Sequence, residues 1–205
     1  MVSNRNVVLA APLAGLLLGV LDFVWIKYVP WPFGDLGNSM AVWAVAAFLL
    51  TWGFRWSLPV GTAGAIVCLI VAVPSYYLAA ALIQNDDWSN LFNASSLAWM
   101  GFGVVAGAVF GAAGVIARTP GRLQAVAVGM PAAVLFAEAV IKAGRIGDPS
   151  YDTTDQLEAV AVLVTLGVLI TLWVGGSWRR RALGLVFALP LTAVGYALLS
   201  VIGFR

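Results

Sequence analysis

The sequence predicts an all-α protein that crosses a lipid bilayer about seven times, as a single transmembrane helical-bundle domain over residues 1–205. Hydrophobic residues make up 62% of the chain and charged residues only 10%. A soluble domain of this size cannot bury that much apolar side chain, so lipid must be the solvent. The apolar residues also fall into segments of spanning length, and the charged residues lie between them. Together these observations predict a polytopic membrane protein.

Seven apolar segments are expected to span the membrane. About 20 residues, at a rise of about 1.5 Å each, cross a hydrocarbon core of about 30 Å. The first segment follows Arg5, as in a signal peptide, but it continues without a polar cleavage region and is interpreted as a helix. The second is the shortest. The expected spans are 7–28, 40–55, 60–84, 97–117, 123–143, 157–177 and 182–203.

Charge alternates between successive polar segments. One side of the expected membrane carries arginines and no acidic residue: Arg5, Arg55, Arg118, Arg122, Arg179, Arg180 and Arg181. The other side receives Asp35, Asp86, Asp87, Asp148, Asp152 and Asp155, together with Lys27, Lys142, Arg145 and Arg205. Because cytoplasmic loops of membrane proteins are enriched in Lys and Arg, we expect a cytoplasmic N-terminus and an external C-terminus.

Glycines recur at helical spacing in two of the spans. Gly103, Gly107 and Gly111 form one face of the fourth span, and Gly15 and Gly19 repeat the spacing in the first. Small residues at this spacing let helix backbones approach closely in lipid. We therefore expect tight helix packing at both faces.

Two acidic residues lie deep inside the spans, at Asp22 and Glu138. A charged group there costs about 2.5–3.5 kcal/mol, so such residues usually line pathways or active sites. Counted from the cytoplasmic edge, both lie about 22 Å along their helices. A structural role stays open: Asp22 could bond to a neighbouring helix, and Glu138 could pair with Lys142 one turn away.

Aromatic residues gather in the same outer layer. Tyr76, Tyr77 and Tyr196 lie about 21–25 Å along their spans, and Trp25, Trp43 and Trp99 fall in the outer half. These six are the candidate substrate-binding residues, since aromatic faces stabilise cations. Four further tryptophans near the cytoplasmic side fit an interfacial belt: Trp52, Trp56, Trp173 and Trp178.

Composition and motifs exclude several kinds of chemistry. Histidine is absent and Cys68 is the only cysteine, which removes the commonest general base and the usual thiolate and imidazole metal ligands. Asp86 and Asp87 match a metal-binding aspartate motif poorly. The sequence has no P-loop, dinucleotide fingerprint, HExxH or GxSxG motif. We expect no metal, no cofactor and no nucleic-acid partner.

The residues that remain favour an enzyme that starts its reaction by protonation. A carboxyl group in an apolar pocket can hold its proton at neutral pH and act as a general acid. Protonation of an epoxide or olefin in a prenyl chain starts a carbocation cyclisation, which aromatic walls stabilise and a dry cavity protects from water. Asp22 and Glu138 are the candidate catalytic pair, and their spacing leaves open which one donates the proton.

Seven spans in 205 residues, two separated intramembrane acids and many aromatics resemble the small integral-membrane terpene cyclases of meroterpenoid pathways. That resemblance implies cyclisation of an epoxidised or plain prenyl chain by acid, without metal. The segments "GDLGNSMAVW" and "VPSYYLAAAL" are similar to uncharacterised actinobacterial membrane proteins. They imply a multi-pass protein of a bacterial cell membrane, in contact with membrane lipids.

Other functions use the same two acids. In a transporter or substrate-capture component they would bind a cation or carry protons, and in an accessory subunit they would contact another chain. A closed pocket rimmed by Trp and Tyr favours the enzyme, whereas a hydrated route across the bilayer favours transport.

Overall fold

The computed structural model describes residues 6–201, so Arg5 and Arg205 lie outside the described residues. Within this range the chain is helical and contains no strand, which confirms the all-α prediction. The helices are α1 (Val7–Tyr28), η1 (Phe33–Asn38), α2 (Met40–Phe54), α3 (Leu58–Gln84), η2 (Trp88–Leu91), α4 (Ala94–Arg118), α5 (Gln124–Ala143), α6 (Thr153–Val174) and α7 (Trp178–Val201), where η marks a 3-10 helix.

Six of these helices are long and apolar enough to cross a membrane, judged by length and composition. The exception is α2, whose 15 residues extend only about 22 Å. It is therefore shorter than the hydrocarbon core of about 30 Å. The chain is a polytopic helical bundle. Among the helices expected to cross the membrane, α2 is the one that is too short to span it.

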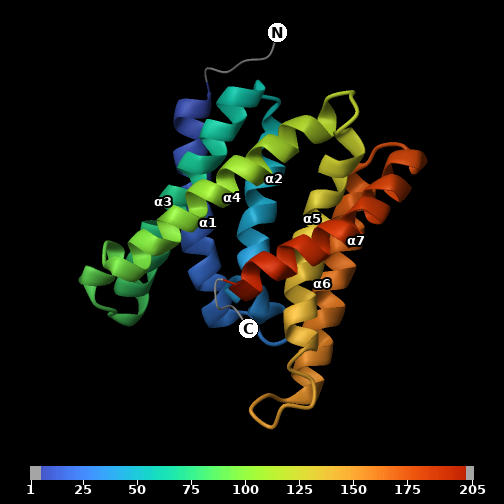
Figure 1. Cartoon of the computed structure of the whole chain (residues 1–205). Helices are drawn as coiled ribbons and strands as arrows, with labels where there is room; N and C mark the ends of the chain where they lie inside the picture. The colour runs from blue at the N-terminus through green and yellow to red at the C-terminus, as the bar shows by residue number, and fades with distance from the viewer. Residues whose placement is uncertain (1–5, 202–205) are drawn as a thin grey trace.

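Successive helices run in opposite directions, so their connections alternate between two ends of the bundle (Figure 1). The connections after α2, α4 and α6 lie at the end where α1 begins, and they carry the described arginines of the acid-free side. The connections after α1, α3 and α5 lie at the opposite end and carry the six loop aspartates. Charge is thus sorted to opposite ends of the fold. Which end faces the cytoplasm remains a prediction from the positive-inside rule.

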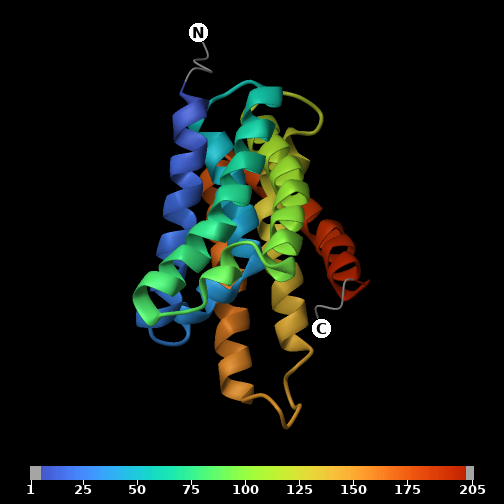
Figure 2. The same ribbon diagram turned by 90° about the vertical axis from the view of Figure 1, so that its left-hand side faces the viewer.

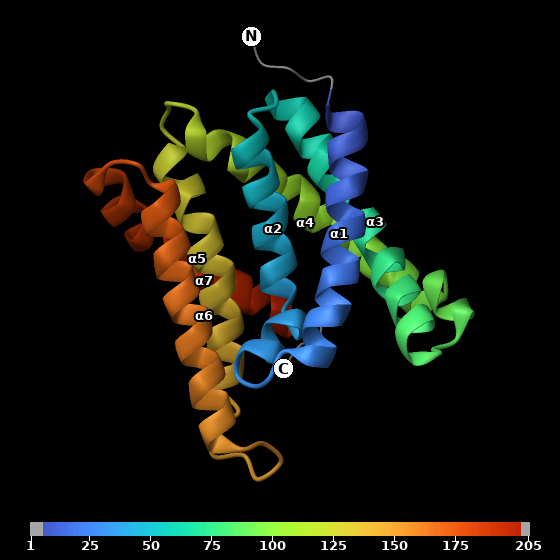
Figure 3. The same ribbon diagram turned by 180° about the vertical axis from the view of Figure 1, so that it is seen from behind.

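The helices form two groups on either side of α2. In one group α3 packs between α1 and α4, and in the other α5 packs against α6 and α7. Figure 3 shows α2 between α1 and the α5–α6 pair, and α2 also contacts α3, α4 and α5. The α5–α6 hairpin extends beyond the other helices at the aspartate-bearing end (Figure 2). A short central helix between two groups leaves room beside its N-terminus, where the cavity described below lies.

Glycine faces hold α3 against both of its neighbours. A Cβ atom on Gly19 of α1 would lie 2.1 Å from the carbonyl oxygen of Ala72. A Cβ atom on Gly107 of α4 would lie 2.7 Å from the Cα atom of Ile66. Neither position has room for a larger side chain without separating the helices. The predicted close packing at the two glycine faces is confirmed.

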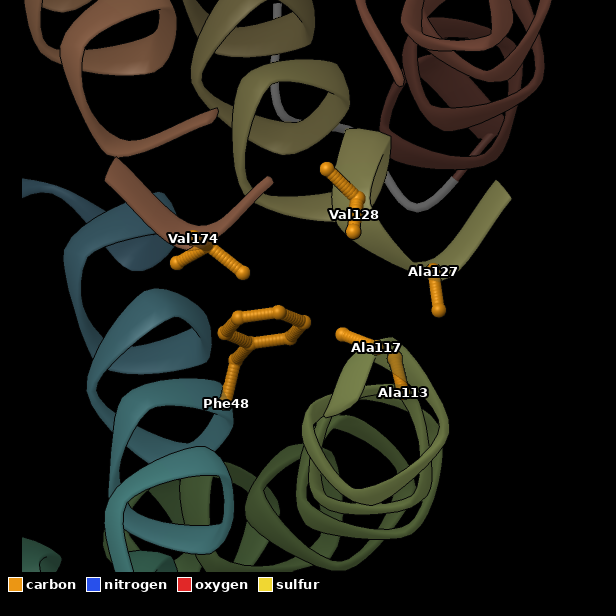
Figure 4. Close-up of a cluster of buried hydrophobic side chains, with 6 residues drawn as sticks. All are labelled: Phe48, Ala113, Ala117, Ala127, Val128 and Val174. Carbon is orange, nitrogen blue, oxygen red and sulfur yellow. The ribbon is translucent and has the colours of Figure 1, made fainter. Parts of the chain in front are cut away.

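An apolar cluster fills the arginine-bearing half of the bundle between α2, α4, α5 and α6 (Figure 4). Its buried members are Phe48, Ala113, Ala117, Ala127, Val128 and Val174. Nearby, Thr51 Oγ1 of α2 donates a 2.8 Å hydrogen bond to the carbonyl oxygen of Gly111 in α4. Packed side chains therefore fill the space between these four helices in this half of the protein.

The expected interfacial belt of tryptophans is wrong at Trp56. Its side chain is fully buried, and its indole nitrogen donates a 2.8 Å hydrogen bond to Asn6 Oδ1. The Arg118 guanidinium donates to the Trp56 carbonyl oxygen. Trp56 thus ties the starts of α1 and α3 to the end of α4, whereas Trp173 and Trp178 are exposed as a belt requires.

Candidate functional site

A cavity of about 440 Å³ lies toward the aspartate-bearing end of the bundle. Its walls come from α1 to α5, from the segment 37–39 that ends η1, and from one residue of α7, and most of its lining side chains are apolar or aromatic. The volume lies within the range of about 300–1,000 Å³ that is usual for small-molecule sites.

Both intramembrane acids line this one cavity. Asp22 enters from α1 and Glu138 from α5, and both residues are buried within the protein. Four of the six aromatic residues expected at the site also line it, namely Trp43, Trp99, Tyr76 and Tyr77. The structure therefore brings together residues from five helices that are far apart in the sequence.

Asp22 lies beside an aromatic side chain that can donate to it. The Trp43 indole of α2 is close to the Asp22 carboxyl group, and because an indole N–H is a donor only, the carboxyl group is the acceptor of the two. Around the pair the cavity wall is formed by apolar residues of α3 and α4, including Leu69 and Val73. Asp22 is thus a buried carboxyl group oriented toward α2 in apolar and aromatic surroundings.

Glu138 is held at the N-terminus of α2. Its Oε2 atom accepts a hydrogen bond of 2.8 Å from Ser39 Oγ and one of 3.0 Å from the backbone N–H of Ala41. Ser39 is also the N-cap of α2, accepting from the backbone N–H of Val42. The N-terminus of a helix carries a partial positive charge that stabilises anions. These donors favour negative charge on Glu138, and its burial opposes that charge.

Lys142 forms its salt bridge with Asp35 and not with Glu138, on which its positive charge acts only at longer range. Lys142 Nζ lies 2.7 Å from Asp35 Oδ2 in η1, and this is the only salt bridge among residues 6–201. The pair joins the segment before α2 to the end of α5. It fixes η1 over the end of the cavity where Asn38 and Ser39 form part of the wall.

The aromatic residues pack in edge-to-face pairs around the cavity. Tyr76 has its ring centroid 5.5 Å from that of Phe23 and 5.4 Å from that of Tyr77. On the facing helix, the centroids of Trp99 and Phe102 are 5.7 Å apart. Such contacts fix the ring orientations, and ring faces can stabilise a positive charge in the cavity.

Two of the expected substrate-binding residues do not line the cavity. Trp25 is 43% exposed, and its indole nitrogen donates a 2.8 Å hydrogen bond to the carbonyl oxygen of Phe33 in η1. Tyr196 of α7 is also 43% exposed. On α1 the cavity is lined by Asp22 and Ile26, four residues apart, so the lining strip is too narrow to include Trp25. The rotation of α1 and α7 about their axes therefore places the side chains of Trp25 and Tyr196 outside the cavity.

Sequence reasoning missed several residues of the site. Ser39 contacts Glu138 directly, and Phe102 and Phe110 add aromatic walls from α4. A serine just before an apolar segment is a common N-cap, and this signal could have identified the start of α2. Nothing in the sequence indicates that the cap also reaches α5.

The acidic loops cap helices. Asp87 Oδ1 accepts from the backbone N–H of Ser89 at 2.8 Å, and this hydrogen bond lowers the pKa of Asp87. Asp152 likewise accepts from the backbone N–H groups of Thr154 and Asp155 at the start of α6. These aspartates therefore have a structural explanation that needs no metal.

The fold and the cavity define a polytopic helical membrane protein with two buried carboxyl groups lining one aromatic-walled cavity. The chain belongs to a family of unknown function, DUF6518, whose model matches residues 2–203. No curated protein and no solved structure matches the chain. Membership of this family assigns no activity, so a function must be argued from the cavity.

Proposed function

We propose that this protein is a membrane-bound terpene cyclase, which protonates an epoxidised or plain prenyl chain and guides the resulting carbocation to a cyclic product. The observation that carries the proposal is that two buried carboxyl groups, Asp22 and Glu138, line one cavity of about 440 Å³ with aromatic walls. In this proposal the protein lies in a bacterial cell membrane, with its arginine-bearing end in the cytoplasm.

The surroundings of the two carboxyl groups support different roles. Glu138 Oε2 accepts from Ser39 and from a helix N-terminus, so it is suited to be the carboxylate that collects a proton. Asp22 lies beside Trp43 in a cavity with mostly apolar walls, so it is suited to be the acid. A pair of acids in contrasting environments is a common basis for assigning donor and acceptor.

The proposed reaction with an epoxide is an isomerisation. The Asp22 carboxyl proton adds to the epoxide oxygen, the C–O bond breaks, and a hydroxyl group and a tertiary carbocation form. The π electrons of an olefin in the same chain then form a new C–C bond to that carbon. Glu138 removes a C–H proton, whose bonding electrons become the final double bond. The proton must return to Asp22 before the next turnover.

The aromatic residues have a defined part in this scheme. A carbocation has no hydrogen-bonding group, so ring faces and the Glu138 carboxylate are the groups that can stabilise it. Tyr76, Tyr77, Trp43 and Trp99 line the same cavity as the two acids. Closely packed rings also exclude water that would trap the cation.

Transport is the alternative function for the same acids. It requires a path from one end of the bundle to the other. The buried cluster around Phe48 and Val128 occupies the arginine-bearing half between the helices that form the cavity. The cavity shares no lining residue with the separate hollow beside Arg122 and Gln124 at the arginine-bearing end, so the described residues show no continuous path between the two ends, which supports the enzyme over the transporter.

The test uses Asp22→Asn and Glu138→Gln, which remove the ionisable group and keep the side-chain shape. With an epoxidised prenyl substrate and the full-length protein in nanodiscs, each variant should lose about 100-fold or more in turnover. Asp155→Asn and Glu158→Gln are the matched controls, because both carboxylates lie on α6 outside the cavity, and they should turn over normally. Turnover unchanged in both cavity variants would refute the proposal.

A further inference from the structure

The cavity has a wall that is also exposed on the outside of the bundle. Val105 and Val109 of α4 line the cavity, yet 64% and 48% of their surfaces are exposed. Gly103, a lining residue on the same helix, is buried. A residue that faces both the chamber and the exterior marks the mouth of the chamber. The mouth therefore lies along the Val105–Val109 edge of α4.

The helix across this mouth is α7. Leu199 is the lining residue that α7 contributes. However, α7 packs mainly on α5, while α4 packs on α2, α3 and α5. Figure 1 shows α4 and α7 on the same face of the bundle, with α2 behind them. The two helices thus flank the opening without packing tightly against each other.

This opening faces the bilayer. The mouth residues lie 11 and 15 residues after Ala94, the first residue of α4, which places them about 16–22 Å along that helix. They lie well inside a segment apolar enough to span a membrane, and the side chains at the mouth are all aliphatic. Water is excluded at this depth, so only a molecule dissolved in the bilayer can reach the mouth.

Polar and apolar walls occupy different parts of the cavity. Asn38, Ser39 and Glu138 lie where η1 is fixed over the chamber by the Asp35–Lys142 salt bridge. The α4 wall runs from Trp99 to Phe110, about 16 Å along the helix, and it contains only apolar and aromatic residues. The ligand that matches both parts is a chain with one polar end.

We propose that the cavity is loaded sideways from the bilayer, through a portal between α4 and α7 formed by Val105, Val109 and Leu199, and that its ligand is a linear prenyl alcohol, bound with its hydroxyl end near Glu138. The choice of a prenyl ligand rests on the proposed function. The portal itself rests on the exposure of the lining residues.

The experiment uses the full-length protein in nanodiscs and farnesol carrying a diazirine at its tail. After illumination, labelled residues are mapped by mass spectrometry, and excess unlabelled farnesol shows which labelling is competable. We expect competable labelling on α4 between residues 102 and 110, and on Leu199. Competable labelling absent from both α4 and α7 would overturn the portal.

Blocking variants provide the second measurement. Val105→Trp and Val109→Trp, combined, should slow competable labelling about tenfold, because they obstruct the route that sets the association rate. Val104→Trp is the matched control, since Val104 is exposed on α4 and does not line the cavity. It should label at the wild-type rate. A wild-type rate in the blocked protein, or equal slowing in the control, would refute the portal.

The readout is binding, so it separates this inference from the proposed function. A protein that takes up the probe through the portal but converts no prenyl substrate would refute the cyclase alone. A protein that cyclises its substrate while the tryptophan substitutions leave uptake unchanged would refute the portal alone.

Discussion

Ser39 Oγ donates a 2.8 Å hydrogen bond to Glu138 Oε2, across 99 residues of sequence. The same hydroxyl oxygen caps α2 by accepting from the backbone N–H of Val42. One side chain therefore fixes both the start of the short central helix and the position of a buried carboxylate. Any shift of the α2 N-terminus moves the acid's two donors together.

Ser39→Ala should both destabilise the protein and impair the proposed reaction. Loss of an N-cap costs about 1 kcal/mol, and loss of a hydrogen bond to a charged group costs about 1.5–3 kcal/mol. Ser39→Thr keeps the hydroxyl group and should restore most of both properties. Thermal unfolding in detergent and turnover of an epoxyprenyl substrate provide the measurements. An alanine variant as stable and as active as the threonine variant would show that the hydroxyl group does not have this role.

Trp43→Phe and Trp25→Phe should have different effects, because Trp43 lines the cavity and Trp25 does not. Trp43 lies beside Asp22 in the cavity wall, so its replacement should lower turnover or change the products by altering the surroundings of the acid. Trp25 bonds to Phe33 outside the cavity, so its replacement should lower the unfolding temperature modestly, since one neutral hydrogen bond contributes about 1 kcal/mol. Product analysis by mass spectrometry measures the effect of Trp43→Phe, and a melting curve measures the effect of Trp25→Phe. Equal effects of the two changes on products would contradict this division.

Gly107→Leu should disrupt the α3–α4 interface. A Cβ atom at Gly107 would meet the backbone of Ile66 at 2.7 Å, whereas one at Gly101 would meet nothing within 4 Å. Overpacking a tight interface costs about 1–3 kcal/mol, and more where backbone must move. We expect Gly107→Leu to lower the melting temperature and the yield of folded protein, and Gly101→Leu, on the same helix, to behave as wild type. Similar melting of the two variants would argue against a close α3–α4 contact.

Single cysteines should reveal the orientation. In a Cys68→Ala background, Ser150→Cys lies at the aspartate-bearing end and Gly121→Cys at the arginine-bearing end. Under the positive-inside rule, a membrane-impermeant maleimide added to intact cells should label Ser150→Cys only, and permeabilisation should allow labelling of Gly121→Cys. The opposite pattern would invert the assignment and place the cavity toward the cytoplasm.

Local sequence was enough to predict the helices. The expected first span, 7–28, coincides with α1, and the others agree with the structure to within a few residues. Hydropathy and the helical rise depend only on neighbouring residues, so span bounds and depths follow from them. The common depth of Asp22 and Glu138 along their helices could be predicted for the same reason.

Residues at the same depth along their helices need not line the same cavity. The sequence by itself predicts the depth of a residue, but not which cavity its side chain lines. It determined a polytopic helical bundle, with charge sorted to its two ends and two acids in one layer, because these properties follow from hydropathy and helix geometry. The tertiary structure decided which side of each helix faces inward: it placed Trp43 and Trp99 in the cavity, left Trp25 and Tyr196 outside, and paired Lys142 with Asp35. Helix rotation is set by packing against neighbours, here by glycine contacts such as that of Gly19 with Ala72, and no single helix carries that information.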